Sequence, residues 1–349
     1  MRPWTRCGPT TLSAVAMGLF AFGCGGSGGH AAASPSPSPI IAIPVAPVVA
    51  APAGCPTGAT VSDATQLRGA LGGAKPGDVI VLTPGLYAGH FIATSSGTTD
   101  APITLCGGRD ATLDGGSIKT GYTVYLNGAS WWRLVGFSVQ GGQKGVVTDH
   151  ANHVLISGLY VHDVGDEAIH LRSFSSDNTV EGVTIRATGK LRSKFGEGIY
   201  IGTANSNWCK YTGCQPDASD RNVVRNNDIS QTTAENIDVK EGTSAGQIVD
   251  NLLSGAGMVS SAATAWVNVK GNDWTIDGNV GRDSIKDGFQ VHRVYQGWGA
   301  RNVFRSNRAE VNGPGFGFYV QSAALATVVA CDNVAIGAAL GLTNTSCAK

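Results

Sequence analysis

Short alternating segments recur along the chain and constrain its fold more than any other feature. They are TVYLN at 123, GVVTD at 145, AIHLR at 168, GIYIG at 198, NIDVK at 236, WVNVK at 266, GFQVH at 288 and GFYVQ at 317, and they follow one another at intervals of 22 to 38 residues. Repeats of this length are typical of the coils of a solenoid, in which the longer intervals contain loop insertions. The 49 glycines and only 3 methionines also favour an all-β chain.

A second repeated position carries asparagine. The segments VRNN, IVDN, IDGN, FRSN and ACDN end in Asn227, Asn251, Asn279, Asn307 and Asn333. Asparagine tolerates left-handed backbone and hydrogen-bonds at turns, so one per coil can stack into a ladder. The two repeats together predict an all-β, single-stranded parallel β-helix.

The start of the repeat region contains a helix signal. SDATQLRGALGGAKPGDVIVLTPGLYAG reads as an amphipathic helix that caps the first coil, followed by a strand. This opening resembles that of right-handed parallel β-helix proteins, particularly polysaccharide lyases of the pectate lyase-like superfamily. The resemblance covers roughly residues 55 to 347 and implies a right-handed solenoid with an N-terminal capping helix.

Three regions follow from composition. Residues 1–24 read as a signal peptide, 25–53 as a Pro/Ala/Ser-rich spacer, and 54–349 as the catalytic β-helix domain. The AFGC sequence favours a lipoprotein with Cys24 lipidated and attached to a membrane, while HAAAS offers ordinary cleavage near Ala31 to Ala33. We therefore expect a secreted or extracellular monomer.

Apart from Cys7 and Cys24 the chain has six cysteines, an even number that suggests three disulfides in an exported protein. No CxxC pairs support zinc instead. Neighbours in sequence order would pair, although other pairings are open: Cys55 with Cys106, Cys209 with Cys214, and Cys331 with Cys347.

Alternation predicts which side chains point outward from the coils and face water. Residues two apart share a face of a strand, and equivalent residues of successive coils form columns. The first outward column is Tyr125, Val147, His170, Tyr200, Asp238, Asn268, Gln290 and Tyr319. The second is Asn127, Asp149, Arg172, Gly202, Lys240, Lys270, His292 and Gln321, and a third contains Glu167, Glu197, Glu235 and Asp287.

These columns concentrate charge on one face of a chain in which only 14% of residues are charged. Outward charges of a solenoid are most often merely solvated or paired. Lys240 stands out because it neighbours Lys270 and lies where the intervals are longest, so loops there can wall a groove. The carboxylates Glu197, Glu235 and Asp238 could bind Ca²⁺, although ordinary ion pairing with neighbouring basic residues is the simpler explanation.

The balance of 25 basic and 25 acidic residues argues against nucleic acid as a partner. β-Elimination on an anionic, uronic-acid polysaccharide fits better, because it needs a cation for the carboxylate, a base for the C5 proton and an acid for the leaving oxygen. The substrate-binding candidates are His170, Asp238, Asn268, Gln290 and the aromatic residues Trp208, Trp298 and Tyr319.

AENIDVKEG resembles the acidic strand that carries calcium ligands and a catalytic lysine in β-helix lyases of families 6 and 9. A Tyr and Lys on adjacent coils is similar to family 31 alginate lyases. The resemblance implies Lys240 as base and Tyr200 as acid, or the reverse, with Arg172 or Lys270 facing the substrate carboxylate. His292 joins the catalytic candidates because it lies in the same column, and alginate is the favoured uronan.

Other functions remain open at this point. An inverting glycoside hydrolase on the same fold would pair Glu197 with Glu235 or Asp238. A C5-epimerase would use nearly the same groups as a lyase. A non-catalytic cell-surface adhesin or sugar-binding module would explain the spacer and the aromatic residues without Lys240 or Tyr200.

Overall fold

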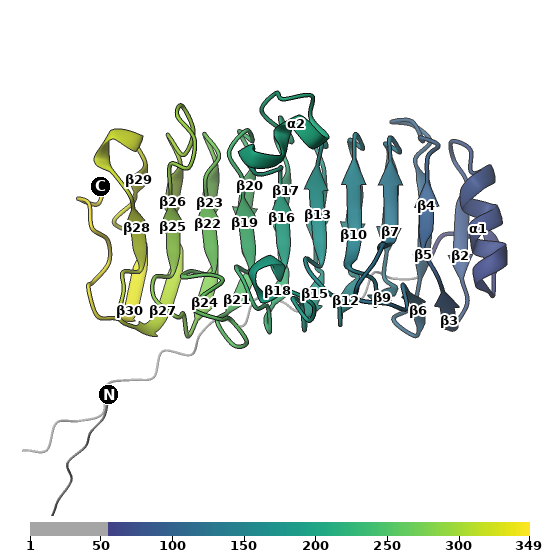
Figure 1. Cartoon of the computed structure of the whole chain (residues 1–349), viewed down its shortest axis with the longest axis horizontal. Coiled ribbons are helices and arrows are strands. Elements are labelled where there is room, and N and C mark those ends of the chain that lie inside the picture. The colour runs from purple at the N-terminus through teal and green to yellow at the C-terminus, as the bar shows by residue number, and fades with distance from the viewer. Residues whose placement is uncertain (1–54) are drawn as a thin grey trace, which may run out of the picture. The chain divides into compact units, whose positions relative to one another are not determined.

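The computed structural model describes residues 55–349, which form a solenoid of parallel β-strands (Figure 1). The predicted signal peptide and spacer, and the predicted boundary between the spacer and the domain, lie outside the described residues. Within the described part of the chain, no helix combines the length and the apolar character needed to cross a membrane.

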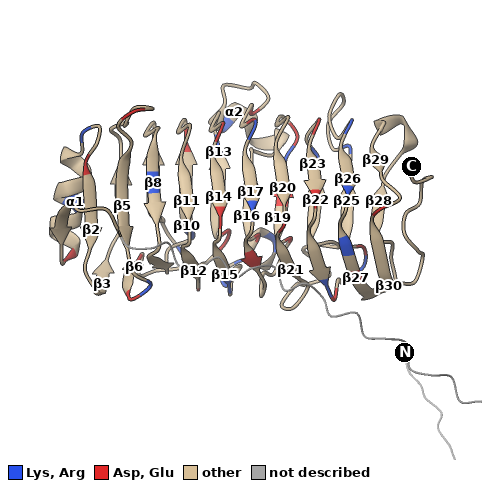
Figure 2. Ribbon diagram, turned by 180° about the vertical axis from the view of Figure 1, so that it is seen from behind, with Lys and Arg blue, Asp and Glu red and all other residues tan. Residues whose placement is uncertain are grey.

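Three parallel sheets run along the solenoid, and the chain visits them in turn. The front sheet, which faces the viewer in Figure 1, consists of β4 (Phe91–Ala93), β7 (Tyr122–Asn127), β10 (Lys144–Asp149), β13 (Ile169–Arg172), β16 (Ile199–Ile201), β19 (Ile237–Val239), β22 (Val267–Val269), β25 (Phe289–Val291) and β28 (Phe318–Val320). The back sheet, which faces the viewer in Figure 2, consists of β1 (Ala59–Val61), β2 (Val79–Leu82), β5 (Ile103–Gly107), β8 (Trp132–Val135), β11 (Leu155–Ser157), β14 (Thr179–Glu181), β17 (Val223–Arg225), β20 (Gln247–Val249), β23 (Thr275–Asp277), β26 (Val303–Arg305) and β29 (Val328–Val329). The side sheet consists of β3 (Gly85–Ala88), β6 (Ala111–Asp114), β9 (Ser138–Gln140), β12 (Tyr160–His162), β15 (Thr184–Arg186), β18 (Asp228–Ile229), β21 (Leu252–Ser254), β24 (Val280–Arg282), β27 (Arg308–Gly313) and β30 (Val334–Ala338).

Helix α1 (Ala64–Gly73) covers the first coil, as predicted (Figure 1). The Asp63 carboxylate caps it by accepting hydrogen bonds from the backbone N–H groups of Thr65 and Gln66 at 2.8 and 2.9 Å. Leu67 and Leu71 of the helix are buried against the core. The exposed end of the hydrophobic core is thereby closed.

The strand register confirms the predicted columns. Ile199 pairs with Ile169 on one side and with Ile237 on the other, which places Tyr200 between His170 and Asp238. The inward positions of these strands are fully buried and form the stacked core. Because equivalent residues of neighbouring coils are paired directly, side chains far apart in sequence meet on the front sheet.

The asparagine ladder is also present. The Asn279 carboxamide oxygen accepts hydrogen bonds from the Asn251 backbone N–H at 3.0 Å and the Asn251 side chain at 2.8 Å, and Asn279 in turn donates to Asn307. The left-handed residue at this turn is the one before the ladder position, Asn226, Asp250, Gly278 or Ser306 in the first four coils of the ladder, and not the ladder asparagine itself. The ladder therefore satisfies buried backbone groups and leaves the tight turn to its neighbour.

Basic and acidic residues lie on strands of the back sheet (Figure 2), and some of them form ion pairs between neighbouring coils. Arg225 on β17 donates to the Glu181 carboxylate on β14 at 2.8 and 2.6 Å, and Arg305 pairs with Asp277 at 2.8 Å. These arginine side chains are about half exposed, with 50% and 55% of their surface accessible. Such exposed pairs contribute little to stability and have no partner groups that suggest chemistry.

Three disulfides join cysteines that follow one another in the sequence. Cys55–Cys106 attaches the start of the domain to β5, and Cys331–Cys347 holds the C-terminal tail against the last coil. Cys209–Cys214 closes a short loop around α2 (Trp208–Tyr211), which rises beside the front sheet (Figure 1). The Cys209–Cys214 bridge therefore stabilises a segment next to the site described below.

Candidate active site on the front sheet

The outward side chains of the front sheet form the floor of the site. The sequence predicted that they face water, but several of them are buried. Arg172 is only 3% exposed and Asp238 only 1%. The reason is that long insertions between coils fold back over the sheet on both sides. On one side the insertion after β16 is held down by Asp217, whose carboxylate accepts the backbone N–H groups of Ser173 and Phe174, both at 2.8 Å.

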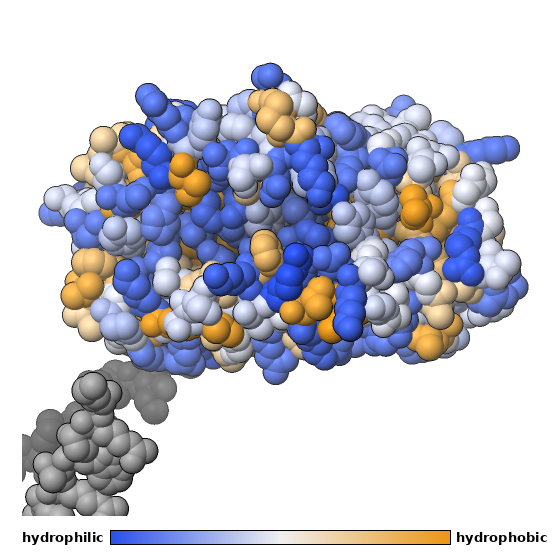
Figure 3. All heavy atoms as spheres, in the orientation of Figure 1, coloured by the Kyte–Doolittle hydropathy of each residue, from blue (hydrophilic) through white to orange (hydrophobic). Residues whose placement is uncertain are grey.

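A cleft of about 430 Å³ lies between these insertions. The central part of this face is hollowed and mostly hydrophilic (Figure 3). The cleft is lined by Tyr122, Gln143, Lys144, Glu167, His170, Arg172, Arg192, Phe195, Tyr200, Thr203, Ala204, Asn207, Lys210 and Tyr211. Four of these residues are lysine or arginine, so the cleft suits an anionic ligand.

Tyr200 lines the cleft, and Lys240 lies against it without lining the cleft itself. The Lys240 Nζ is 4.7 Å from the centre of the Tyr200 ring and 2.6 Å from an Asp238 carboxylate oxygen. Burial disfavours the charged amine, yet the Asp238 charge outweighs it and raises the pKa of Lys240 well above its usual range. For Tyr200, burial raises the pKa well above its usual range, although the Lys240 charge acts in the opposite direction. The free protein therefore holds an ammonium beside a neutral phenol.

Asp238 is shared between two lysines. Its second carboxylate oxygen accepts a hydrogen bond from Lys270 Nζ, which is itself buried. Burial opposes ionisation of Asp238, but the two lysines outweigh it and lower its pKa. The structure thus brings together Lys240, Lys270 and Asp238 as one buried charge network beside Tyr200.

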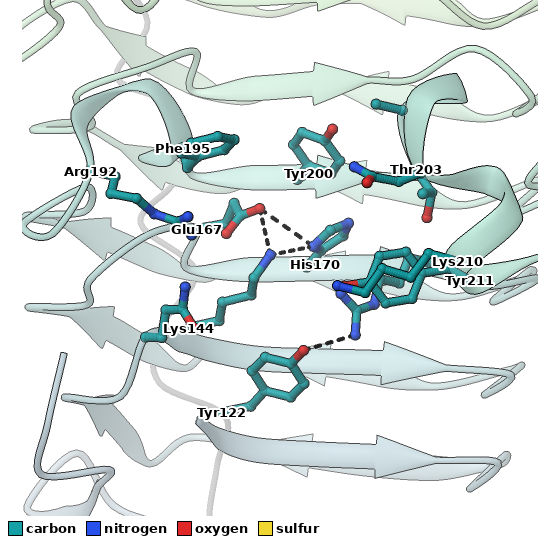
Figure 4. A pocket seen from close by; sticks show the side chains of 14 residues that line it. Tyr122, Lys144, Glu167, His170, Arg192, Phe195, Tyr200, Thr203, Lys210 and Tyr211 are labelled. Atoms are coloured by element: carbon teal, nitrogen blue, oxygen red, sulfur yellow. Dashed lines mark hydrogen bonds and ion pairs between the residues drawn. The ribbon is translucent and has the colours of Figure 1, made fainter. Parts of the chain in front are cut away.

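The floor continues past Tyr200 through His170, whose ring lies 4.4 Å from the Tyr200 ring in an edge-on arrangement. His170 Nε2 is 2.9 Å from the Gly202 carbonyl, so this nitrogen carries the proton, and Nδ1 accepts from Lys144 Nζ at 3.0 Å (Figure 4). Lys144 also binds Glu167 at 2.6 Å. Burial and the nearby Lys144 charge lower the pKa of His170 well below its usual range, so the imidazole is neutral.

Arg172 is held rigidly at the far side of the cleft. Its guanidinium donates two hydrogen bonds to Asp149, at 2.6 and 3.0 Å, and one to the Tyr122 hydroxyl at 3.0 Å. It also lies 4.3 Å from the centre of the Tyr211 ring. A guanidinium fixed on several sides presents its remaining N–H groups in one orientation.

The other predicted residues lie beyond Lys270, away from the cleft. His292 Nδ1 is 2.9 Å from the Asn268 carboxamide oxygen, and its ring lies 5.7 Å from that of Tyr319. Asn268 and Gln290 are buried and bound to acidic neighbours, Asn268 to Glu235 at 3.1 Å. Gln290 donates to Asp287 at 2.7 Å.

The predicted aromatic residues differ in accessibility. Trp208 is only 5% exposed and donates from its indole nitrogen to the Thr203 carbonyl at 2.8 Å, so it holds the α2 segment together instead of facing the cleft. Its ring contacts that of Tyr295, 5.0 Å away, in the insertion after β25. Trp298, in the same insertion, and Tyr319 are partly exposed.

The three carboxylates predicted to bind calcium do converge, with donor atoms of Glu197, Glu235 and Asp238 within 4.8 Å of one another. Calcium in proteins takes about six to eight oxygen ligands. Here both oxygens of Asp238 are already bound by Lys240 and Lys270. A divalent cation at this position would be repelled by two ammonium groups, so the donor set does not fit calcium.

We therefore expect EDTA to leave the activity of the full chain unchanged, because the buried lysines already neutralise Asp238. The measurement is the initial rate after dialysis against EDTA, compared with the same protein supplied with Ca²⁺. Activity that disappears in EDTA and returns with Ca²⁺ would contradict this interpretation of the acidic cluster.

Sequence reasoning missed several residues of the cleft. Tyr122 and Lys144 pair across β7 and β10 and stand two residues before the anchors Val124 and Val146. They extend the third outward column by two coils, so that column could have identified them. Arg192 and Phe195 lie in a coil insertion, where no strand register indicates their position.

Residues 122–282 match the family model described as a right-handed β-helix region. An alginate lyase from Paenibacillus sp. str. FPU-7 is 34% identical to this chain, with a TM-score of 0.74, and the match covers 81% of this chain and 96% of the lyase. The pectate lyase Pel9A shares the fold at 13% identity and a TM-score of 0.56, with 80% of this chain and 72% of Pel9A covered. No curated protein sequence matches the chain.

The identity to the Paenibacillus enzyme extends over nearly all of that protein, so it reaches beyond a shared architecture. The predicted fold and enzyme class are both confirmed. The chain belongs to the family of right-handed parallel β-helix polysaccharide lyases.

Proposed function

We propose that this lyase cleaves a uronic-acid polysaccharide, with alginate as the preferred substrate, and that it acts outside the cell. The observation that carries the proposal is the contact of Lys240 with Tyr200, 4.7 Å from Nζ to the ring centre, because Tyr200 lines the cationic cleft. The 34% identity to an alginate lyase supports the choice of uronan.

β-Elimination needs one group to remove the C5 proton and another to protonate the leaving O4. Lys240 and Tyr200 are assigned these two proton transfers, because they are adjacent and reach the same part of the floor. Both are protonated in the free protein, so the one that acts as base first releases its proton to solvent water, and the one that stays protonated supplies a proton to O4.

Lys270 has a supporting role in this scheme. Because it also binds Asp238, Lys240 can turn towards a substrate without leaving that buried carboxylate unpaired. Arg172, held by Asp149, offers its free N–H groups to the substrate on the other side of Tyr200.

The test is an absorbance assay for the unsaturated product. The full chain is incubated separately with alginate, polygalacturonate, chondroitin and glucuronan. We expect the signal to appear on alginate first. Absence of signal on all four polymers would overturn the uronan proposal, whereas a signal confined to another uronan would overturn only the choice of alginate.

A further inference from the structure

One wall of the cleft is a coil insertion, residues 187–196, that is anchored unusually well for a loop. A Cβ on Gly189 would lie 1.7 Å from Thr233 Oγ1, and one on Gly196 would lie 1.9 Å from the same atom. Thr233 Oγ1 in turn donates to the Ser193 carbonyl at 2.9 Å. The close packing against Thr233 fixes the wall relative to the strands beneath it.

Arg192 in this wall is oriented by a buried carboxylate. Its Nε donates to Asp166 at 3.0 Å and its Nη2 binds the second Asp166 oxygen, while Gln143 also donates to Asp166 at 2.8 Å. Asp166 is completely buried, but 47% of the Arg192 side chain is exposed. Among residues 55–349, nothing binds the remaining Arg192 nitrogen, Nη1.

Phe195 follows on the same wall and is 45% exposed, although it lines the cleft. The Arg192 guanidinium lies 4.4 Å from the centre of its ring and supports it. An exposed aromatic ring backed by a fixed cation presents a flat apolar surface to a ligand. Sugar rings, which have an apolar face and polar edges, fit such a surface.

Lys144 provides a second fixed cation on the floor beside this wall (Figure 4). Its Nζ is held by Glu167 at 2.6 Å and by His170 at 3.0 Å, which uses two of its three N–H groups. Lys144 and Arg192 therefore each retain a donor after binding their own acidic partners. Neither contacts Lys240 in the described residues.

We propose that Arg192, Lys144 and Phe195 form a subsite for a second uronate unit, separate from the proton-transfer pair Lys240 and Tyr200. Phe195 stacks on the sugar ring, while Arg192 and Lys144 bind its carboxylate. The proposal rests on the proposed uronan lyase function. Its consequence is that the enzyme recognises at least two consecutive charged sugars and binds a neutral polysaccharide poorly.

Binding is measured by calorimetry in the Lys240→Ala background, with an alginate hexasaccharide as the probe. A charge-assisted hydrogen bond contributes roughly 1.5–3 kcal/mol, so Arg192→Gln is expected to weaken binding about 10- to 100-fold. Phe195→Ala is expected to weaken it about 5-fold or more, given roughly 1 kcal/mol for an aromatic contact. Arg225→Gln is the matched control, because Arg225 makes the same kind of carboxylate pair on the back sheet.

In the active enzyme, Arg192→Gln is expected to raise KM on alginate while kcat stays within about 3-fold. The reason is that the lost contact stabilises the bound substrate and the transition state equally, so the rate of the proton transfers is unchanged. Arg192→Lys and Phe195→Ala serve as second variants if loss of the Asp166 pair prevents Arg192→Gln from folding. Unchanged affinity in folded Arg192 and Phe195 variants, or an equal loss in Arg225→Gln, would overturn the subsite. A parent protein that cleaves no uronan would instead overturn the proposed function.

Discussion

Replacing Lys240 with Ala is expected to lower kcat on alginate by about 10²- to 10⁴-fold, the usual contribution of a positioned acid or base. The variant removes the ammonium that lies against Tyr200 and binds Asp238. Asp238 keeps its hydrogen bond with Lys270, so the fold should survive the change. The measurement is the initial rate of unsaturated product formation, together with a thermal unfolding curve.

Lys119→Ala is the control, because that lysine is exposed and contacts neither Tyr200 nor Asp238. It should retain full activity. If folded Lys240→Ala also retains activity, Lys240 and Tyr200 are not the proton-transfer pair, although the family assignment would stand.

Replacing Asn279 with Ala is expected to reduce the free energy of unfolding by about 3 kcal/mol or more. The change leaves two Asn251 donors and the Ile248 carbonyl without their partner inside the turn. Each buried polar group left unpaired costs roughly 1–3 kcal/mol. The measurement is urea-induced unfolding followed by circular dichroism.

Asn127, exposed at the end of β7, provides the matched control. Asn127→Ala should change the free energy of unfolding by less than about 0.5 kcal/mol, as surface substitutions usually do. Equal stability of the two variants would mean that the ladder contributes nothing specific to the coil.

The positions of the front-sheet residues could be predicted because a solenoid repeats. Once Ile199 and Ile237 are recognised as equivalent, Tyr200 and Asp238 must be neighbours, and the observed register agrees. The same logic would have reached Lys144 if the third column had been extended one coil towards the N-terminus, and Tyr122 if it had been extended two.

Burial could not be predicted in this way. Alternation correctly indicates that Asp238 points away from the core, yet only 1% of it is exposed. Trp208 shows the same limit, because an aromatic residue in an insertion can face a ligand or fill a gap, and here it is buried and donates to the Thr203 carbonyl. Exposure depends on how insertions fold over the sheet, and their sequences have no repeat that sets this.

The sequence by itself therefore determined the coil order, the inward and outward faces and the adjacency of Lys240 with Tyr200, because parallel pairing between neighbouring coils is local and periodic. Only the tertiary structure decided that Asp238 binds two lysines and that Arg192 is fixed by Asp166. Those contacts depend on side-chain directions and on a wall held in place by Thr233, which belongs to another coil. Periodicity places residues in columns, but the packing of irregular insertions decides which of them can meet a substrate.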